Sequence, residues 1–390
     1  RDSIQRHQWD AAEASAKELL AKFPEEPEAA SLLKEIRGDR DREIRNRNRA
    51  AELFAAARLK DQGRFDREAM EWLREASALA PEDKSIAALY EKFASYTRTV
   101  HVPGDFPDLH KALQSCGDRD RIVLGEGTWP GPLVITKAIT LEGAGPDKTF
   151  IEVNAKESAA ATFGPGSKGA RVSGVCFRPT SFDTSPNRFP ALLVRGGELT
   201  ASDCRFIDAS GHGVAVIDSG AFTARRCTFE NNGWDGVAAR GKGTRLTLEE
   251  CEANNNYGHG YDAWECAAVS IHSSHAFQNS RKGILVDTTA PEVSLADNDL
   301  RANREFGIVV SAAASGNVST NVCRENLLGG LVMRAAAGQL IVENNRAEKN
   351  TGPGLVLEQG LVPAKYATNA ATANGGGKDT LNGVDFSSPQ

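Results

Sequence analysis

The sequence has no apolar run that could cross a membrane, no excess of positive charge and no C-x-x-C cysteine pair. Because a membrane-spanning helix needs about 18 or more consecutive apolar residues, we expect no such helix. The formal net charge of −6 gives no support for nucleic-acid binding. Residues 164–166 and 241–244 are rich in glycine, but neither has the spacing of a phosphate-binding P-loop followed by a helix. We interpret both as turns.

The chain contains instead an internal repeat between residues 208 and 358. A glycine followed by an apolar residue recurs at steps of 23 or 24 residues. The glycines are Gly213, Gly236, Gly260, Gly283, Gly307, Gly330 and Gly354. Six of the seven units have an asparagine four residues before the glycine: Asn232, Asn256, Asn279, Asn303, Asn326 and Asn350. Self-similarity at a fixed short period is the signature of a solenoid.

Each repeat has room for short strands but not for an amphipathic helix. One unit holds two alternating runs, residues 237–240 and 246–251, bounded by glycine and asparagine. Such runs predict β-strands. A coil of this length wraps once around a narrow core and pairs with the next coil about 4.8 Å along the axis. The repeat therefore predicts a parallel β-helix.

Equivalent residues of successive coils are expected to stack in rows. The first inward row is predicted to be Val214, Val237, Tyr261, Ile284, Ile308, Leu331 and Leu355. The second is predicted to be Cys204, Cys227, Cys251, Ser274, Asn298, Cys323 and Asn345. The asparagines should form a ladder at a turn, where their amides bond one another and the turn backbone and where asparagine tolerates a left-handed φ. The glycines would supply either an unusual φ or a close backbone approach.

The stacked cysteines allow two interpretations. Coils about 4.8 Å apart would permit a disulfide among Cys204, Cys227 and Cys251. We favour a buried stack of free thiols, because free cysteine behaves as a small buried hydrophobe. Free thiols would favour a reducing compartment.

Residues 1–96 have a helical pattern. Apolar and alanine residues predict two helix pairs, which turn at Pro24 and Pro81. The pattern resembles the tetratricopeptide family, and the resemblance implies a protein partner for these helices. The prolines lie 57 residues apart, whereas the family repeats every 34 residues or so, which interrupts any regular array. Because Arg1 falls within the helical pattern, we expect the chain to be a fragment or a processed product.

An arginine-rich segment, residues 37–49, lies between the two predicted helix pairs. It holds six arginines among acidic residues. We favour a solvated helical face or linker over a nucleic-acid contact, since charge runs of mixed sign are usually solvated.

Residues 97–118 are predicted to be a joint and a capping helix, and residues 119–390 a β-helix of about ten coils. Within residues 107–116, Leu109, Ala112 and Leu113 lie on one side of the helix, which would cover the open end of the first coil. Residues 179–190 are interpreted as a loop excursion. After residue 358 the pattern decays into a last coil and a C-terminal cover.

Several stretches resemble known families. Residues 121–145 and 148–153, with a Gly-Thr-Trp turn and an Ile-Thr-Leu-Glu-Gly strand, resemble the opening coils of the pectate-lyase-like and pectin-methylesterase-like superfamily. The repeats from 190 to 358 are similar to NosD-like carbohydrate-binding and sugar-hydrolase repeats. The resemblance covers roughly residues 98–385. It implies a right-handed parallel β-helix, a carbohydrate ligand and a secreted or envelope location, so the compartment stays open.

Polar and aromatic side chains gather on the second to fourth coils of the repeat. In the strand after each glycine, alternation sends the first and third residues inward and the second and fourth outward. The candidate catalytic residues are Asp235, His259, Asp262 and Lys282. The candidate ligand-binding residues are Trp234, Arg240, Tyr257, Trp264 and Asp287. An exposed indole beside charged groups suits a sugar ring, which stacks on the indole while its hydroxyls bond the charges.

Two functions from different classes remain open. The first is a non-catalytic binding or scaffold module, whose β-helix presents one face to a carbohydrate or a protein. The alternative is a polysaccharide lyase, hydrolase or uronate epimerase, in which an aspartate acts as acid or cation ligand and His259 or Lys282 removes a proton. The tight, nearly equal coils favour binding, because grooves on a β-helix need long loops. A third interpretation is a hydrated outer face whose charges keep the sheet soluble.

No cofactor is expected, although the lyase version of the alternative would add Ca²⁺. The run 257–262 resembles the Asp-Pro-His-Asp signature of β-helix alginate epimerases, but it lacks the proline and the first aspartate. His272 and His275 are too few and too divergent to predict a metal site.

Overall fold

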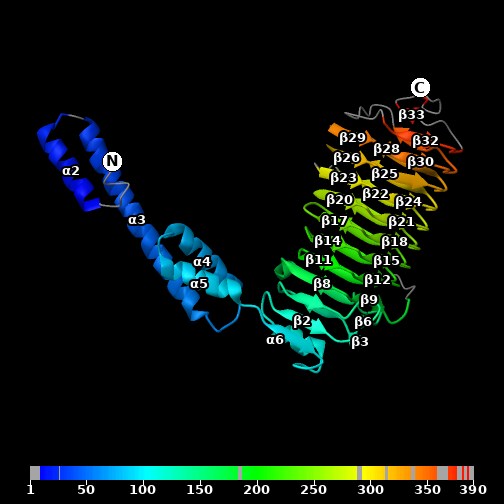
Figure 1. Cartoon of the computed structure of the whole chain (residues 1–390), viewed down its shortest axis with the longest axis horizontal. Helices are drawn as coiled ribbons and strands as arrows, with labels where there is room; N and C mark the ends of the chain where they lie inside the picture. Colours follow the sequence, from blue (N-terminus) through cyan, green and yellow to red (C-terminus); the bar gives the residue numbers. More distant parts are fainter. Residues whose placement is uncertain are drawn as a thin grey trace. The chain divides into compact units, whose positions relative to one another are not determined.

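The computed structural model shows two compact units, Arg1–Thr97 and Arg98–Gln390. It describes residues 9–390, apart from residues 26, 183–186, 288–291, 312–314, 335–338, 358–367, 376–379, 382–383 and 386–390. The first unit is helical and the second is a stack of strands (Figure 1). None of the described helices is long and apolar enough to cross a membrane.

The helical unit contains the two helix pairs expected around the prolines. Its helices are α2 (Trp9–Lys22), α3 (Pro27–Leu59), α4 (Arg67–Leu79) and α5 (Lys84–Ser95). The side chain of Asp66 accepts a hydrogen bond from the backbone N–H of Ala69 and so caps α4, and Asp83 caps α5 in the same way. Helix α3 also links the two pairs, because α2 packs on its first half and α4 on its second.

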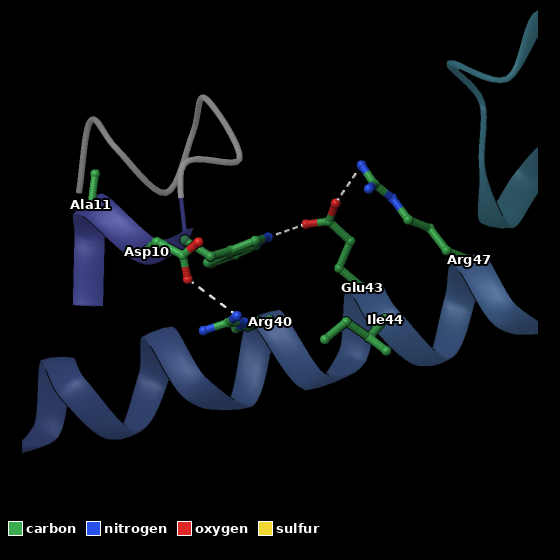
Figure 2. A pocket seen from close by; sticks show the side chains of 7 residues that line it. Asp10, Ala11, Arg40, Glu43, Ile44 and Arg47 are labelled. Carbon is green, nitrogen blue, oxygen red and sulfur yellow. Dashed lines mark hydrogen bonds and ion pairs between the residues drawn. The ribbon is translucent and has the colours of Figure 1, made fainter. Parts of the chain in front are cut away.

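The arginine-rich segment 37–49 is the middle of α3. Its arginines form exposed ion pairs along and between the helices, two of which appear in Figure 2. The pairs include Arg37–Glu13, Arg40–Asp10, Arg42–Asp39, Arg47–Glu43 and Arg49–Glu75. The interpretation as a solvated helical face is confirmed, and the segment is not a linker.

The second unit is a solenoid of three sheets, which we name A, B and C. Sheet A contains β1 (Thr99–Val102), β2 (Arg121–Leu124), β5 (Thr140–Glu142), β8 (Ala170–Ser173), β11 (Glu198–Ser202), β14 (Ala221–Arg225), β17 (Arg245–Glu249), β20 (Ala268–His272), β23 (Glu292–Ala296), β26 (Ser315–Ser319) and β29 (Gln339–Glu343). Sheet B contains β3 (Gly127–Pro130), β6 (Thr149–Val153), β9 (Cys176–Pro179), β12 (Arg205–Ile207), β15 (Thr228–Glu230), β18 (Glu252–Asn254), β21 (His275–Phe277), β24 (Asp299–Arg301), β27 (Val322–Arg324), β30 (Arg346–Glu348) and β32 (Ala370–Thr372). Sheet C contains β4 (Leu133–Ile135), β7 (Ala161–Phe163), β10 (Leu192–Arg195), β13 (Val214–Ile217), β16 (Val237–Arg240), β19 (Tyr261–Trp264), β22 (Ile284–Asp287), β25 (Phe306–Ser311), β28 (Gly329–Arg334), β31 (Leu355–Leu357), β33 (Thr380–Leu381) and β34 (Val384–Asp385).

Each coil contributes one strand to each sheet, and the coils stack in register (Figure 1). Neighbouring strands are parallel, apart from the antiparallel pair β33 and β34. A short 3₁₀ turn, η1 (Pro165–Ser167), interrupts one of the early coils. The predicted parallel β-helix of about ten coils is confirmed.

A helix covers the first coil, as predicted. Helix α6 (Leu109–Ser115) is capped by Asp108, whose side chain accepts from the backbone N–H of Lys111. Leu109 and Ala112 are buried in the β-helix core, and Leu113 packs against it. The joint before this helix contains β1, which pairs with β2 and so opens sheet A.

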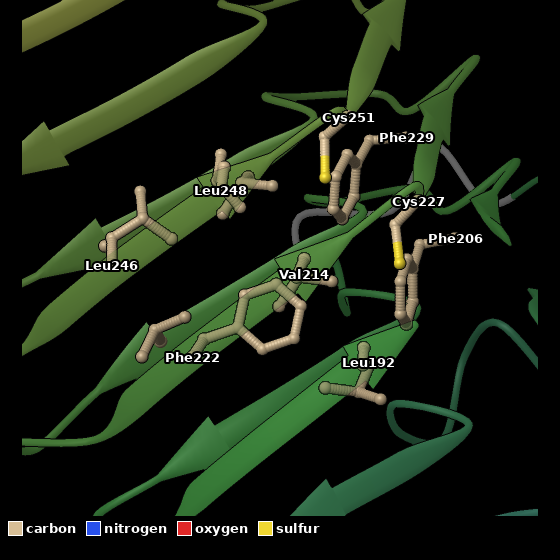
Figure 3. Close-up of a cluster of buried hydrophobic side chains, with 14 of the residues drawn as sticks. Leu192, Phe206, Val214, Phe222, Cys227, Phe229, Leu246, Leu248 and Cys251 are labelled. Carbon is tan, nitrogen blue, oxygen red and sulfur yellow. The ribbon is translucent and has the colours of Figure 1, made fainter. Parts of the chain in front are cut away.

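The core of the β-helix is one continuous column of stacked apolar side chains (Figure 3). The row predicted from the repeat is confirmed: Val214, Val237, Tyr261, Ile284, Ile308, Leu331 and Leu355 pair in register and are buried. Phe206 stacks on Phe177 and Phe229, with ring centroids 5.4 and 5.2 Å apart. Stacking of like residues on successive coils is what the short repeat makes possible.

The second predicted row is right except at Cys323. Cys323 lies on β27, where it pairs with Leu300 and Ala347 in sheet B. The position assigned to it belongs to Asn321, whose side chain bonds Asn345 and whose Oδ1 accepts from Asn298. The error is one of register, since Cys323 comes two residues after the stacked asparagine.

The free-thiol interpretation of the cysteines is confirmed. All seven cysteines are buried, and none of them forms a disulfide. Hydrogen bonding within the stack and burial raise the pKa of the Cys227 and Cys251 thiols far above their usual range. These thiols therefore act as small core side chains and not as nucleophiles.

The predicted asparagine ladder is present and fully bonded. At each step, the amide Oδ1 accepts from both the backbone N–H and the side-chain Nδ2 of the asparagine one coil earlier. The Nδ2 also donates to a carbonyl of the preceding coil, as from Asn279 to Ala253 O at 3.0 Å. A second ladder, which was not predicted, is formed in the same way by Asn298, Asn321, Asn345 and Asn369.

The backbone conformation of the repeated turn differs from the prediction in one respect, because the ladder asparagine itself is not left-handed. The left-handed residue is the one before each ladder asparagine, such as Asn255 at φ 54° or Ala302 at φ 53°. The repeat glycines serve for close approach, because a Cβ on Gly283 would lie 2.7 Å from Gly307 O. Their φ values are not in the left-handed region.

The excursion at residues 179–190 lies only partly within the described residues, because 183–186 are not described. Phe182 approaches Gly233, and the guanidinium of Arg188 lies 5.9 Å from the centre of the Trp234 ring. The predicted C-terminal cover falls largely on residues outside the described part of the chain.

Candidate functional site

The residues just before the repeat glycines link successive coils. The backbone N–H of His259 donates to Asp235 Oδ1 at 2.7 Å, and the backbone N–H of Lys282 donates to His259 Nδ1 at 3.1 Å. One coil earlier, His212 Nδ1 lies 3.3 Å from the backbone nitrogen of Asp235 and 3.1 Å from its Oδ2. Each side chain thereby accepts a hydrogen bond from a backbone N–H group of the next coil. These residues therefore have a structural role beside any functional one.

Most of the second residues of these strands are buried, although they lie on the outer side of sheet C, and Leu285 and Val356 are half-buried. Asp262 is only 5% exposed, and Ala238 and Val309 are likewise buried. The interpretation of this face as a fully hydrated surface is therefore wrong at these positions. The fourth residues Arg240 and Trp264 pair in register and stay exposed, and Arg240 reaches back to Asp262.

Two buried carboxylates, Asp235 and Asp262, share Arg240, and their pKa values are shifted in opposite directions. Arg240 Nη2 donates to Asp262 Oδ2 at 3.0 Å and lies 3.8 Å from Asp235 Oδ2. Burial acts to raise the pKa of Asp235, but His212 and the backbone N–H of His259 outweigh burial and lower it. Burial, with the charge of Asp235, raises the pKa of Asp262 in spite of Arg240. Asp235 therefore holds its negative charge more firmly than Asp262.

His259 is held as a neutral ring. Burial lowers its pKa to about 4, and the positive charges of Lys282 and Arg281 act in the same direction. Because Nδ1 accepts the hydrogen bond from the backbone N–H of Lys282, the ring proton of the neutral form lies on Nε2. His259 is thus suited to donate a hydrogen bond and not to remove a proton.

Replacement of Asp262 by asparagine should stabilise the protein at pH 7. A raised pKa means that the folded state favours the protonated carboxyl, so the ionised form costs stability at neutral pH. We expect the free energy of unfolding of Asp262→Asn to exceed that of the wild type by about 1 kcal/mol at pH 7. The difference should shrink as the pH falls towards about 4, where the carboxyl becomes protonated in both states.

Urea denaturation at several pH values would measure this effect, with Asp287→Asn as a control that should change stability by less than about 0.5 kcal/mol. A wild type more stable than Asp262→Asn at pH 7 would contradict the assigned direction.

Two adjoining hollows lie over this cluster. One has a volume of about 340 Å³ and is lined by Asp235, Arg240, His259, Asp262, Trp264, Arg281, Leu285 and Asp287. The other has about 280 Å³ and is lined by His212, Trp234, Asp235, Arg240, Tyr257, Gly258 and Arg281. Asp235, Arg240 and Arg281 belong to both, so the hollows meet along these side chains.

Eight of the nine predicted site residues line these hollows. The exception is Lys282, whose ammonium pairs with Glu305. Arg281, which was not predicted as a site residue, borders both hollows and pairs with Glu305 at 3.2 Å. Arg281 stands two residues before Gly283, the same position that Trp234 occupies before Gly236, and this correspondence could have identified it.

The site does not offer the donors that a calcium-dependent lyase would need. Among the described residues, no group of three or more His, Cys, Asp or Glu side chains is placed to hold a metal ion. Asp235 and Asp262 are engaged by histidine, backbone and arginine donors. The donor set of the described residues therefore does not fit Ca²⁺.

Comparison with known protein families decides the hand of the solenoid. Residues 187–321 match the family described as the right handed beta helix region. This part of the chain is a right-handed β-helix. The matched β-helix region includes both hollows and the asparagines of both ladders from Asn232 to Asn321. No curated protein matches the chain.

Solved structures similar to this chain include three enzymes. The polygalacturonase from Erwinia carotovora ssp. carotovora is 11% identical, covering 71% of this chain and 93% of its own, with a TM-score of 0.45. The pectin methylesterase from Aspergillus niger is 14% identical, covering 75% and 88%, with a TM-score of 0.40. The A-module of the Azotobacter vinelandii mannuronan C-5 epimerase is 14% identical, covering 66% and 93%, with a TM-score of 0.37.

Proposed function

We propose that the β-helix binds a carbohydrate chain, without cleaving it, on the outer side of β16, β19 and β22. The observation that carries the proposal is the exposure of three aromatic side chains at the rim of a polar floor. Trp234, Tyr257 and Trp264 are 41, 70 and 48% exposed, and each borders one of the two hollows. A sugar ring can place its C–H face on such a ring and its hydroxyls on charged groups.

The polar floor is suited to hydroxyl groups. Asp235 and Asp262 offer carboxylate oxygens, Arg240 and Arg281 offer guanidinium donors, and His259 offers its Nε2–H. Positive and negative groups alternate within a few ångströms, so the floor suits a polar ligand that both donates and accepts. Two adjoining hollows suit consecutive units of one chain better than a single small ligand.

The protonation of His259 and the ion pair of Lys282 support binding over catalysis, because these two side chains are the candidate bases. His259 is neutral with its proton on Nε2, and Lys282 is paired with Glu305 and borders neither hollow. Neither side chain is placed to remove a proton from a sugar carbon. The described side chains thus favour recognition of a polysaccharide.

Replacement of Trp264 by alanine should weaken binding of the recognised polysaccharide by roughly tenfold or more, since a stacked aromatic contributes on the order of 1–3 kcal/mol. Affinity electrophoresis on a panel of neutral and acidic polysaccharides would measure it. Phe23→Ala, which removes an exposed ring from the helical unit, is the control and should bind like the wild type. Failure of the wild type to bind any polysaccharide would contradict the proposal.

A second candidate function is hydrolysis at the same place. The opposite pKa shifts of Asp235 and Asp262 are the pattern expected of a carboxylate base and a carboxylic acid that act together. Incubation with the retained polysaccharide, followed by analysis of reducing ends, tests it. Shortened products that disappear in Asp262→Asn would replace the binding proposal by an enzymatic one.

The helical unit is proposed to dock a protein partner. Its two helix pairs, joined through α3, support this proposal, because helix pairs that resemble tetratricopeptide repeats present extended surfaces to peptides.

A further inference from the structure

The middle of α3 is a helical surface that other described elements cover only in part. The buried residues of α3 are Ala29 and Ile36 in its first half and Ala50, Leu53 and Ala57 in its second. Ile36 joins a small core with α2, whereas the second group joins a separate core with α4 and α5. Segment 37–49, which the structure describes throughout, contains no buried residue. More than three turns of helix therefore lie between two cores and belong to neither.

A hollow borders this segment where α2 begins (Figure 2). Its volume is about 450 Å³, and its lining includes Trp9, Arg40, Glu43, Ile44 and Arg47. Ile44 is 48% exposed in spite of its apolar side chain. An indole and an isoleucine thus form an apolar spot between arginines that lie along one helix.

The segment is basic in a chain that is acidic overall. Residues 37–49 hold six arginines and three acidic residues, so the segment carries a formal charge of +3, whereas the whole chain carries −6. The exposed ion pairs within the unit contribute little each, typically below about 1 kcal/mol. Carboxylates of a partner could therefore replace them and form two parallel hydrogen bonds with a guanidinium. Arg45 makes no ion pair with any residue that the structure describes.

We propose that segment 37–49 of α3, together with Trp9, docks an acidic peptide segment of a partner protein and receives one of its apolar side chains beside Ile44. The inference rests on the proposal that the helical unit docks a protein. It adds which segment of the unit binds and what kind of peptide is bound. Charge complementarity identifies the occupant as acidic. The apolar spot and the three interleaved acidic residues favour a peptide over a nucleic acid, whose phosphates would meet those carboxylates.

Fluorescence anisotropy on the full chain tests the proposal with three labelled peptide panels and a single-stranded RNA. The peptide panels carry one Leu, Phe or Trp within Glu-rich, uncharged or Lys-rich sequences. We expect binding from the Glu-rich panel, weakened at least roughly tenfold by Arg45→Glu and by Ile44→Glu and weakened by added salt. Both substituted side chains are exposed, so folding should not change.

Two matched controls distinguish binding at segment 37–49 from a general effect of charge or of exposed apolar surface. Arg64→Glu makes the same charge change in an exposed turn of the same unit, and Leu59→Glu removes an apolar side chain that is 85% exposed at the end of α3. Both should bind like the wild type. Equal losses in the controls, or RNA binding that Arg45→Glu abolishes, would overturn the proposal. Binding of only the uncharged or Lys-rich panel would also overturn it while leaving protein docking by the unit intact.

Discussion

Replacement of Asn279 by alanine is expected to lower the free energy of unfolding of the β-helix by about 4 kcal/mol. Asn279 Oδ1 accepts from the backbone N–H and the side-chain Nδ2 of Asn256, and its own Nδ2 donates to Ala253 O and Asn303 Oδ1. These groups are buried, and each one left without a partner costs roughly 1–3 kcal/mol. Denaturant unfolding followed by far-ultraviolet circular dichroism would measure the loss.

The neighbouring residue gives a matched control for this prediction. Gln278 is exposed and left-handed, with φ 55°, and the equivalent residue one coil later is already alanine, Ala302 at φ 53°. Gln278→Ala should therefore change stability by less than about 0.5 kcal/mol. If Asn279→Ala were as mild as Gln278→Ala, the ladder would not be a principal source of stability.

The second large effect is a loss of stability in mild acid that depends on His259. Its folded pKa of about 4 lies below the ordinary value of 6.5, so the folded state binds the proton less tightly than the unfolded chain. The stabilisation is present above pH 6.5 and is lost as the pH falls towards 4. This difference corresponds to about 3 kcal/mol, and it arises because burial disfavours the imidazolium.

His259→Asn should remove most of this pH dependence, since the asparagine oxygen can accept from the backbone N–H of Lys282 without gaining a proton. The free energy of unfolding, measured from pH 7 to pH 4, should fall by about 3 kcal/mol less in the variant than in the wild type. Asp235, whose pKa is lowered, contributes in a different window, below the unfolded carboxyl value of about 4. Parallel pH profiles for wild type and variant would contradict the neutral state of His259.

The repeat spacing was sufficient to predict the core and the first asparagine ladder. A period of 23 or 24 residues places Val237 beside Tyr261 and Asn256 beside Asn279, whatever the exact path of each turn. The same reasoning failed at Cys323, because a shift of two residues moves a side chain from a turn into another strand. The second ladder was also visible in the spacing of Asn298, Asn321 and Asn345, but the cysteines that begin that row obscured it.

The sequence predicted where the candidate site lies, but it did not predict the burial and the ion pairs of its side chains. Alternation after each glycine put Arg240, Trp264 and Asp287 on the outer side of sheet C, and these residues do meet in one hollow. Alternation could not show that Asp262 would be buried or that Lys282 would turn to Glu305. Those outcomes depend on the sizes and charges of side chains on neighbouring coils.

The sequence by itself determined the parallel β-helix, its capping helix and the two helix pairs, because each follows from a local period that neighbouring residues share. Only the tertiary structure decided that Asp235 and Asp262 share Arg240 and that their pKa values move in opposite directions. It also decided that the middle of α3 lies between two cores and belongs to neither. A period fixes which residues stack, whereas burial and charge at a given point depend on contacts between residues that the period does not relate.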